Sequence, residues 1–103
     1  MFKAMIMLTR REDMSPAQFQ TWWLDEHAPM ARTLPGVRRI VFNLIEGSDP
    51  CDGITELWFD SREDFEAAYE TETGKAVAAD SIAHVASRQR LFVTETEILG
   101  SDI

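Results

Sequence analysis

Apolar and polar positions along the chain predict four strands. Residues 3–9 form a short run in which both alternating faces are apolar, a pattern typical of a strand covered on both sides. Residues 37–47 and 54–60 are two further apolar runs joined by a short turn, which predicts an antiparallel hairpin. Residues 90–98 alternate in character and predict a fourth strand.

The segment after the first predicted strand carries the signals of a helix start. Ser15 is a preferred N-cap residue, Pro16 suits the first helical position, and Gln18 completes a capping box. We expect a helix from Pro16 to about Thr33, because the Leu-Pro-Gly sequence at residues 34–36 stops it.

One face of this predicted helix is apolar and includes a histidine. Phe19, Trp23 and His27 follow at four-residue intervals and therefore share that face, with Trp22 beside them. Pro29 removes a backbone hydrogen bond, so we expect the regular helix to kink or end near His27.

A second helical region follows the hairpin. Ser61 and Asp64 form a capping-box pattern at its start, and Gly74 is expected to break it. Residues 75–87 predict a further short helical piece before the last strand.

The order strand, helix, strand, strand, helix, strand predicts an α+β fold in one domain over residues 1–103. It is the ferredoxin-like βαββαβ arrangement, in which an antiparallel sheet carries its helices on one face. Residues 54–60 present two alternative faces to such helices. Thr55, Leu57 and Phe59 share one face, and Ile54, Glu56, Trp58 and Asp60 share the other. The sequence leaves open which face lines a pocket.

The second face of the predicted sheet needs a cover. It carries apolar residues in several strands, such as Met5 with Met7 or Ile54 with Trp58. An apolar face of this kind is seldom left in water. A second copy of the chain is the simplest cover, so we expect a homodimer with the two sheets face to face, a dimeric α/β barrel.

Charge narrows the range of partners. The chain has 18 acidic and 10 basic residues and a net charge of −8, which disfavours nucleic acids and anionic membranes. No apolar run approaches the roughly 18 residues that span a bilayer. Cys51 is the single cysteine, which suits a reducing compartment. We expect a soluble cytoplasmic protein without a metal site, since no metal-ligand spacing is present.

His27 is the first candidate for chemistry. An unperturbed histidine has a pKa of about 6.5, so it can take or give a proton at neutral pH. Its position near Pro29, where the backbone is disturbed, fits a pocket residue. A lone histidine on an apolar face is more often a packing residue, and both roles stay open.

Two carboxylates and several apolar residues complete the candidate pocket. Glu56 either serves the site or forms an ion pair with Arg38, Arg39 or a partner chain. Asp80 lies four residues before His84, where it either orients an imidazole or forms an exposed surface pair. The full predicted pocket comprises Trp23, Glu56, Leu57, Trp58, Phe59 and Asp80 around His27.

Several short motifs in a fixed order carry a resemblance to a known family. They are R-x-x-x-M-S-x-x-x-F from Arg10, W-x-x-x-H-A-P from Trp23, L-P-G at residues 34–36, and E-L-W-F-D-S from Glu56. In this order and spacing the chain resembles the EthD-like proteins of the dimeric α/β-barrel superfamily over nearly its whole length. The resemblance implies a ferredoxin-like fold and a dimer.

The resemblance implies less about activity. Relatives in the superfamily include isomerases of muconolactone type, cofactor-free monooxygenases of phenolic polyketides, and polyketide cyclases. They act on small cyclic or aromatic compounds in a pocket between sheet and helices. The superfamily also includes haem proteins, but the chain has no haem-specific motif, and we expect no cofactor.

We therefore expect a small homodimer of a catabolic pathway that binds a hydrophobic cyclic or aromatic metabolite. The first hypothesis is a cofactor-independent isomerase, tautomerase or cyclase with His27 as the acid and base. Cofactor-free monooxygenation is the alternative chemistry. A non-catalytic accessory protein or ligand carrier is the rival of a different class, and haem binding is a third hypothesis.

Overall fold

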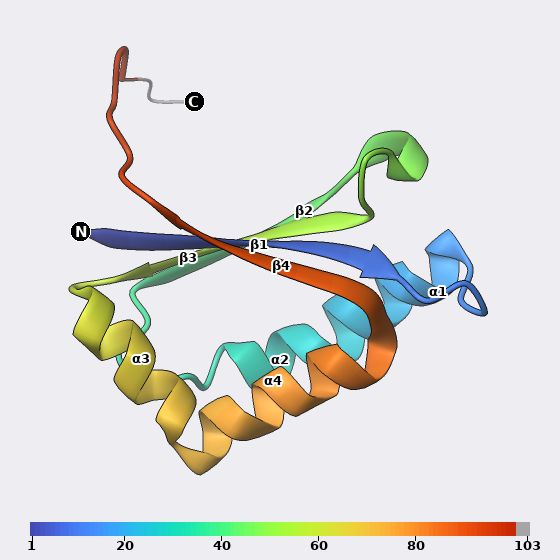
Figure 1. Cartoon of the computed structure of the whole chain (residues 1–103), viewed down its shortest axis with the longest axis horizontal. Coiled ribbons are helices and arrows are strands. Elements are labelled where there is room, and N and C mark those ends of the chain that lie inside the picture. Colours follow the sequence, from blue (N-terminus) through green and yellow to red (C-terminus); the bar gives the residue numbers. More distant parts are fainter. Residues whose placement is uncertain (101–103) are drawn as a thin grey trace.

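The computed structural model describes residues 1–100, in which a four-stranded antiparallel sheet carries helices on a single face (Figure 1). The strands are β1 (Phe2–Arg10), β2 (Arg39–Leu44), β3 (Gly53–Phe59) and β4 (Val85–Val93). They lie in the order β2-β3-β1-β4, and all neighbours are antiparallel. The ferredoxin-like fold that the element order predicts is therefore confirmed.

The helices form a second layer, below the sheet in Figure 1. The first helical segment runs through α1 (Pro16–Thr21), η1 (Trp22–His27) and α2 (Ala28–Ala31). After β3 come α3 (Arg62–Glu70) and α4 (Glu72–His84), and a short 3-10 turn, η2 (Glu46–Ser48), separates β2 from β3. Within residues 1–100, no helix has the length and apolar character needed to cross a bilayer.

Pro29 does not end the first helix, which takes a π-helical turn, η1, just before Ala28 and Pro29. Proline lacks the N–H of a regular helix and is tolerated here in the first turn of α2. The N–H of Ala28 donates to the carbonyl oxygen of Trp23, five residues earlier rather than four. The helix widens, and Trp22, Trp23 and His27 all become buried. One turn thus sends three rings into the interior.

The expected break at Gly74 is wrong, because this residue lies inside α4. The break comes at Thr71, whose hydroxyl oxygen accepts a hydrogen bond of 3.0 Å from the N–H of Gly74. A Cβ on Gly74 would clash with the backbone of Ala68 and Tyr69 in α3. Glycine therefore allows α3 and α4 to meet at a tight corner.

The fourth strand begins at Val85 rather than at Arg90, so the expected bounds are wrong. Pairing with β1, which extends from Lys3 opposite Val93 to Arg10 opposite Val85, overrides the weak local helical pattern. A register shift interrupts this ladder between Thr9 and Arg10. There the pairing steps from Ser87 to Val85 and leaves Ala86 as the extra residue of a β-bulge.

The register of β1 and β3 decides which strand face lies under the helices. Ala4 lies opposite Leu57, and Ile6 lies opposite Thr55. Thr55, Leu57 and Phe59 belong to the buried face of β3. Ile54, Glu56 and Trp58 face away from the helices, because successive side chains of a strand alternate.

Trp23 fixes η1 against the sheet. Its fully buried ring stacks on Phe42 of β2, with ring centroids 4.4 Å apart and an interplanar angle of 9°. A Cβ on Gly53 of β3 would lie 2.5 Å from Cη2 of Trp23. The indole can therefore approach β3 this closely only because residue 53 has no side chain.

We expect Gly53→Ala to lower the free energy of unfolding by about 1–3 kcal/mol, because the new methyl group overpacks the Trp23 ring. Denaturant unfolding followed by tryptophan fluorescence measures this change. Ser87→Ala, at an exposed position of β4, is the control and should unfold like the wild type. Equal stability of Gly53→Ala and the wild type would show that the indole is not held against β3.

Candidate functional site

His27, at the end of the π turn, lies beside a carboxylate of α4. Its Nδ1 is 2.8 Å from Oδ2 of Asp80, and only 6% of the histidine is exposed. An ionised carboxylate can only accept a hydrogen bond, so Nδ1 of His27 carries the proton and donates the hydrogen bond to Asp80. This contact joins residues 53 positions apart in sequence.

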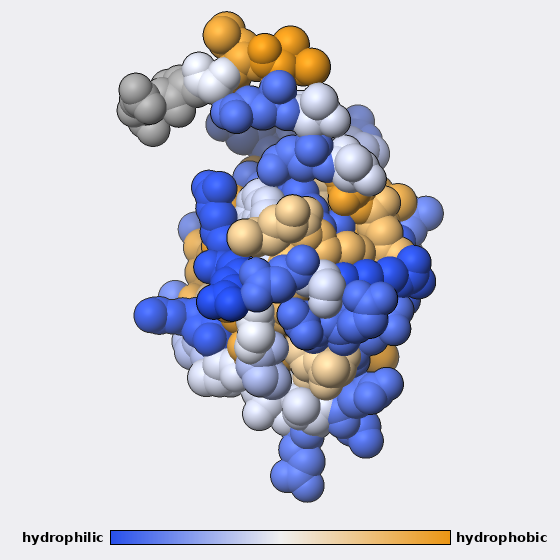
Figure 2. Space-filling view, turned by 90° about the vertical axis from the view of Figure 1, so that its left-hand side faces the viewer, coloured by the Kyte–Doolittle hydropathy of each residue, from blue (hydrophilic) through white to orange (hydrophobic). Residues whose placement is uncertain are grey.

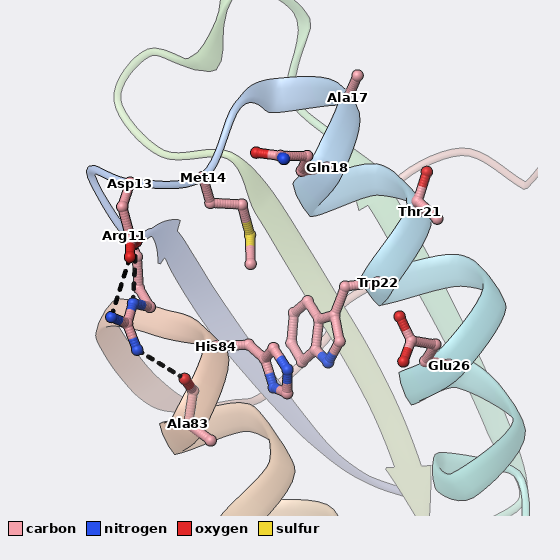
Figure 3. Close-up of a pocket in the computed structure, with 10 residues that line it drawn as sticks. All are labelled: Arg11, Asp13, Met14, Ala17, Gln18, Thr21, Trp22, Glu26, Ala83 and His84. Carbon is pink, nitrogen blue, oxygen red and sulfur yellow. Dashed lines mark hydrogen bonds and ion pairs between the residues drawn. The ribbon is translucent and has the colours of Figure 1, made fainter.

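Asp80 also holds the neighbouring rings. Nε1 of Trp22 donates to Oδ2 of Asp80 at 3.1 Å. His84, one turn further along α4, places Nδ1 at 2.7 Å from the backbone oxygen of Asp80 and at 3.4 Å from Oδ1. Figure 3 shows Trp22 and His84 facing one another, and their rings stack at 4.7 Å and 18°. Asp80 therefore joins η1 to α4 through a cluster of aromatic rings.

Burial lowers the pKa of His27 from the usual 6.5. The hydrogen bond that His27 donates to Asp80 opposes this shift, whereas the positive charge of Arg88 adds to it. The imidazole is consequently neutral at pH 7. With its proton on Nδ1, Nε2 is left with a free lone pair, the form that a general base requires.

A small cavity lies between the helices and the sheet, and His27 forms part of its wall. Its volume is about 20 Å³. The wall consists of Ile6, Leu8, His27, Ala31, Phe42, Thr55, Leu57, Tyr69, Val77, Ser81 and Arg88. Most of these residues are apolar, and the polar ones come from the π turn, α3, α4 and the strands. The cavity thus combines an apolar wall with a few converging polar groups, as ligand sites do.

A wider and more open groove of about 670 Å³ lies on the other side of Trp22 and His84 (Figure 3). Arg11 crosses one end of it, donating to the carboxylate of Asp13 and to the backbone oxygen of Ala83. The Trp22 ring contacts both histidines, with its centroid 5.0 Å from that of His27. The Trp22 indole, together with Asp80 and the two histidines that contact it, therefore separates the groove from the cavity.

A sequence profile of the EthD domain matches residues 11–88. The chain belongs to the EthD family. This match confirms the family resemblance of the motifs around Trp23 and His27. A comparison with curated proteins gives no match.

Solved structures share the fold of this EthD-family chain. A protein of the EthD family from Bacillus halodurans is 24% identical with a TM-score of 0.79, and the match covers 93% of this chain and 100% of the other. SnoaB from Streptomyces nogalater, described as a cofactor-independent oxygenase, is 18% identical with a TM-score of 0.71 over 97% of each chain. A Thermobifida fusca protein of unknown function, described as dimeric and ferredoxin-like, is 14% identical with a TM-score of 0.75 over 91% of this chain and 90% of the other.

The structure brings three of the predicted site residues together. His27 and Leu57 line the cavity. Asp80 lies beside it and accepts a hydrogen bond from His27. Phe59 lies farther along the core, where its ring meets Phe65 edge to face at 5.4 Å.

Trp23 is a packing residue, and its neighbour takes the polar contact. Trp23 is fully buried against Phe42, and its Nε1 has no partner among residues 1–100. Trp22, which the helical spacing treats only as a flanking residue, donates to Asp80. The π turn explains the difference, because it changes the angular positions that a regular helix would give these side chains.

Glu56 and Trp58 lie on the face of the sheet opposite to His27. Glu56 pairs with Lys3 at 2.8 Å, and this contact lowers the pKa of Glu56 and raises that of Lys3. The expected pairing of Glu56 with Arg38 or Arg39 is not found. Arg38 binds Asp60 instead, and Arg39 lies over the Trp58 ring at 4.6 Å.

Four polar residues of the cavity wall are not among the predicted site residues: Tyr69, Ser81, Thr55 and Arg88. If the predicted strand started before Arg88, the Arg-Gln-Arg alternation at residues 88–90 would place the two arginines on one face of it. A strand that starts at Arg90 leaves Arg88 out, and the helical pattern of residues 75–87 gives no reason to start it earlier.

We expect the pKa of His27 to lie below 6.5 in the wild type and to fall further in Asp80→Asn, because the carboxylate raises it. The stabilising contribution of neutral His27 is then complete above about pH 6.5 and declines as the pH falls toward the folded-state pKa. NMR titration of the imidazole Cε1–H measures both values. Asp25→Asn, exposed on the same turn, is the control. A higher pKa in Asp80→Asn would contradict the contact.

Proposed function

We propose that this EthD-family chain is a cytoplasmic homodimer that binds a small hydrophobic cyclic or aromatic metabolite and moves a proton within it. His27 is the general acid and base. The observation that carries the proposal is the 2.8 Å contact between His27 Nδ1 and Asp80 Oδ2 beside a cavity. A buried neutral histidine oriented by a carboxylate, with its second nitrogen unengaged, suits proton transfer.

The proposed reaction is an isomerisation. His27 Nε2 takes a proton from a carbon next to a carbonyl group, and the C–H electron pair moves to the carbonyl oxygen. The imidazolium then returns this proton to another atom of the same molecule as the electron pair moves back, so substrate and product are isomers. Asp80 stabilises the transient positive charge on His27, as the carboxylate of a catalytic triad does.

The small cavity sets a condition on ligand binding. A volume of about 20 Å³ holds about one water molecule and no ring. Tyr69 and Arg88 are the partly exposed polar residues of its wall, and Arg88 belongs to β4 at the edge of the sheet. We expect the Tyr69 side chain to move outward and widen the cavity when a ligand binds.

The same small cavity favours the rival function, a non-catalytic accessory protein or ligand carrier in which His27 only packs. Cofactor-independent oxygenation is the alternative chemistry. SnoaB shares the fold, and a base at His27 would also deprotonate a phenol.

We expect His27→Gln to lower turnover by about 10²–10⁴-fold, the usual contribution of one positioned acid–base group, while ligand binding and Tm stay close to the wild type. Glutamine keeps a hydrogen-bond donor near Asp80 but cannot titrate. Thermal-shift screening with lactones, phenols, aromatic acids and polycyclic quinols selects the compound class for the turnover assay. Asp25→Asn is the matched control and should retain full activity.

Three outcomes would count against a catalytic His27. Equal turnover in His27→Gln and the wild type would assign the residue to packing. The same follows if the variant melts several degrees lower and no compound stabilises the wild type, which favours the carrier. A Soret band after haem titration would favour a haem protein instead.

The outer face of the sheet supports the proposed homodimer. Met5 and Met7 of β1 and Ile54 of β3 are only half-buried there. Figure 2 shows an apolar cluster on the segment that follows β4, and Ile98 and Leu99 of this segment are 90% and 89% exposed. A facing copy of the sheet would remove this surface from water.

We expect Ile54→Glu to weaken the dimer about 100-fold or more, because an unpaired carboxylate would be buried between two sheets opposite Met7. Sedimentation velocity over a concentration series measures the dissociation. Ala67→Glu adds the same charge on an exposed position of α3 and should leave the dimer intact. A wild type that sediments as a monomer would refute the interface.

A further inference from the structure

Arg88 is the feature of the cavity that proton transfer by His27 leaves unexplained. Its side chain lies on the helix-facing side of β4, since Arg88 is opposite Leu8 in the register. Nε is buried and has no hydrogen-bond partner among residues 1–100. The guanidinium is therefore held at the wall of a cavity with a donor unused.

Leaving such a donor unused is costly. A buried guanidinium with an unsatisfied N–H loses hydration without compensation. Burial accordingly lowers the pKa of Arg88. No carboxylate lies in the cavity wall. The protein has a net charge of −8 and many carboxylates, yet none within residues 1–100 forms an ion pair with this arginine.

The surroundings of Arg88 match those of a polar ligand group. His27, Tyr69 and Arg88 line the same cavity. Burial lowers the pKa of His27 and the charge of Arg88 adds to this shift, whereas burial raises the pKa of Tyr69 and the charge of Arg88 opposes that shift. Thr55 and Ser81 add hydroxyl groups to the same wall. The wall thus contains one base, one cation and neutral donors.

We infer that Arg88 is an oxyanion-binding residue and that the ligand of this cavity is a cyclic compound carrying a carboxylate, phenolate or enolate oxygen. The inference rests on the proposed function, because it places that oxygen beside the carbon on which His27 acts. Arginine binds planar oxyanions through paired N–H groups, and such charge-assisted bonds are strong.

The same arginine would serve the reaction itself. When His27 removes a carbon-bound proton, negative charge collects on the carbonyl oxygen. A cation already positioned in a site with little water stabilises that charge without reorganising. Arg88 would then act on the ligand in both roles, in binding and in the step that forms the enolate.

The test compares matched charged and neutral probes in the full-length protein. Benzoate and benzamide share a shape but differ in charge, and calorimetry measures their affinities. para-Nitrophenol reports phenolate formation through its colour, so it distinguishes a phenolate or enolate site from a carboxylate site. The variants are Arg88→Gln and, as the control, Arg32→Gln, an exposed arginine at the end of α2 that does not line the cavity.

We expect the wild type to prefer benzoate to benzamide or to bind para-nitrophenol as its phenolate. Arg88→Gln should weaken the preferred anion by about 10- to 100-fold, the effect of losing a charge-assisted hydrogen bond, and leave benzamide unchanged. Arg32→Gln should retain the anion preference. Bound anion should also shift the NMR signal of the His27 ring in the wild type, which places it in this cavity.

Other outcomes overturn the inference and separate it from the proposed function. If benzamide or a neutral lactone binds and shifts the His27 signal while neither anion does, the anion site is wrong and the proposed function stands. Anion preference that survives in Arg88→Gln also refutes the inference. If neither charged nor neutral probes perturb His27, both proposals fail together.

Discussion

The carboxylate of Asp80 connects the two helical segments of the molecule. It accepts hydrogen bonds from Trp22 and His27, which both come from the π turn, and it lies on α4. Because an ionised carboxylate only accepts, it fixes the tautomer of His27 as well as the ring position. The cavity wall and the protonation state of its base therefore depend on one side chain, and α4 cannot shift along η1 without breaking both contacts.

The parts of the fold that depend on neighbouring residues could be predicted from the sequence. The capping box at Ser15 and Gln18, the hairpin and the order of elements are local patterns, and the structure contains all of them. The candidate residues His27 and Asp80 were recognisable by type. Their contact was not, because it joins two helices across 53 positions and relies on the π turn to aim the rings.

The remaining part of the site depends on which strand face meets the helices, and this is a tertiary property. An alternating strand offers two faces of similar character, and only packing decides between them. Glu56 and Trp58 therefore lie on the far side from His27, while Thr55 lines the cavity. Arg88 escapes prediction for a different reason: the local pattern favours helix up to residue 87, whereas pairing with β1 from Lys3 to Arg10 extends β4 back to Val85.

The β-bulge at Ala86 has a consequence for the polarity of the interior. Val85 packs in the core, and in an unbroken strand the residues sharing its face would be Ser87, Gln89 and Leu91. The extra residue inverts this alternation, so that Arg88 faces the helices instead. A one-residue slip of β4 that closed the bulge and set Ser87 opposite Leu8 would turn Arg88 to the outer face and leave a neutral cavity wall, with no change of sequence. The charge of the cavity wall thus depends on strand register as much as on amino-acid composition.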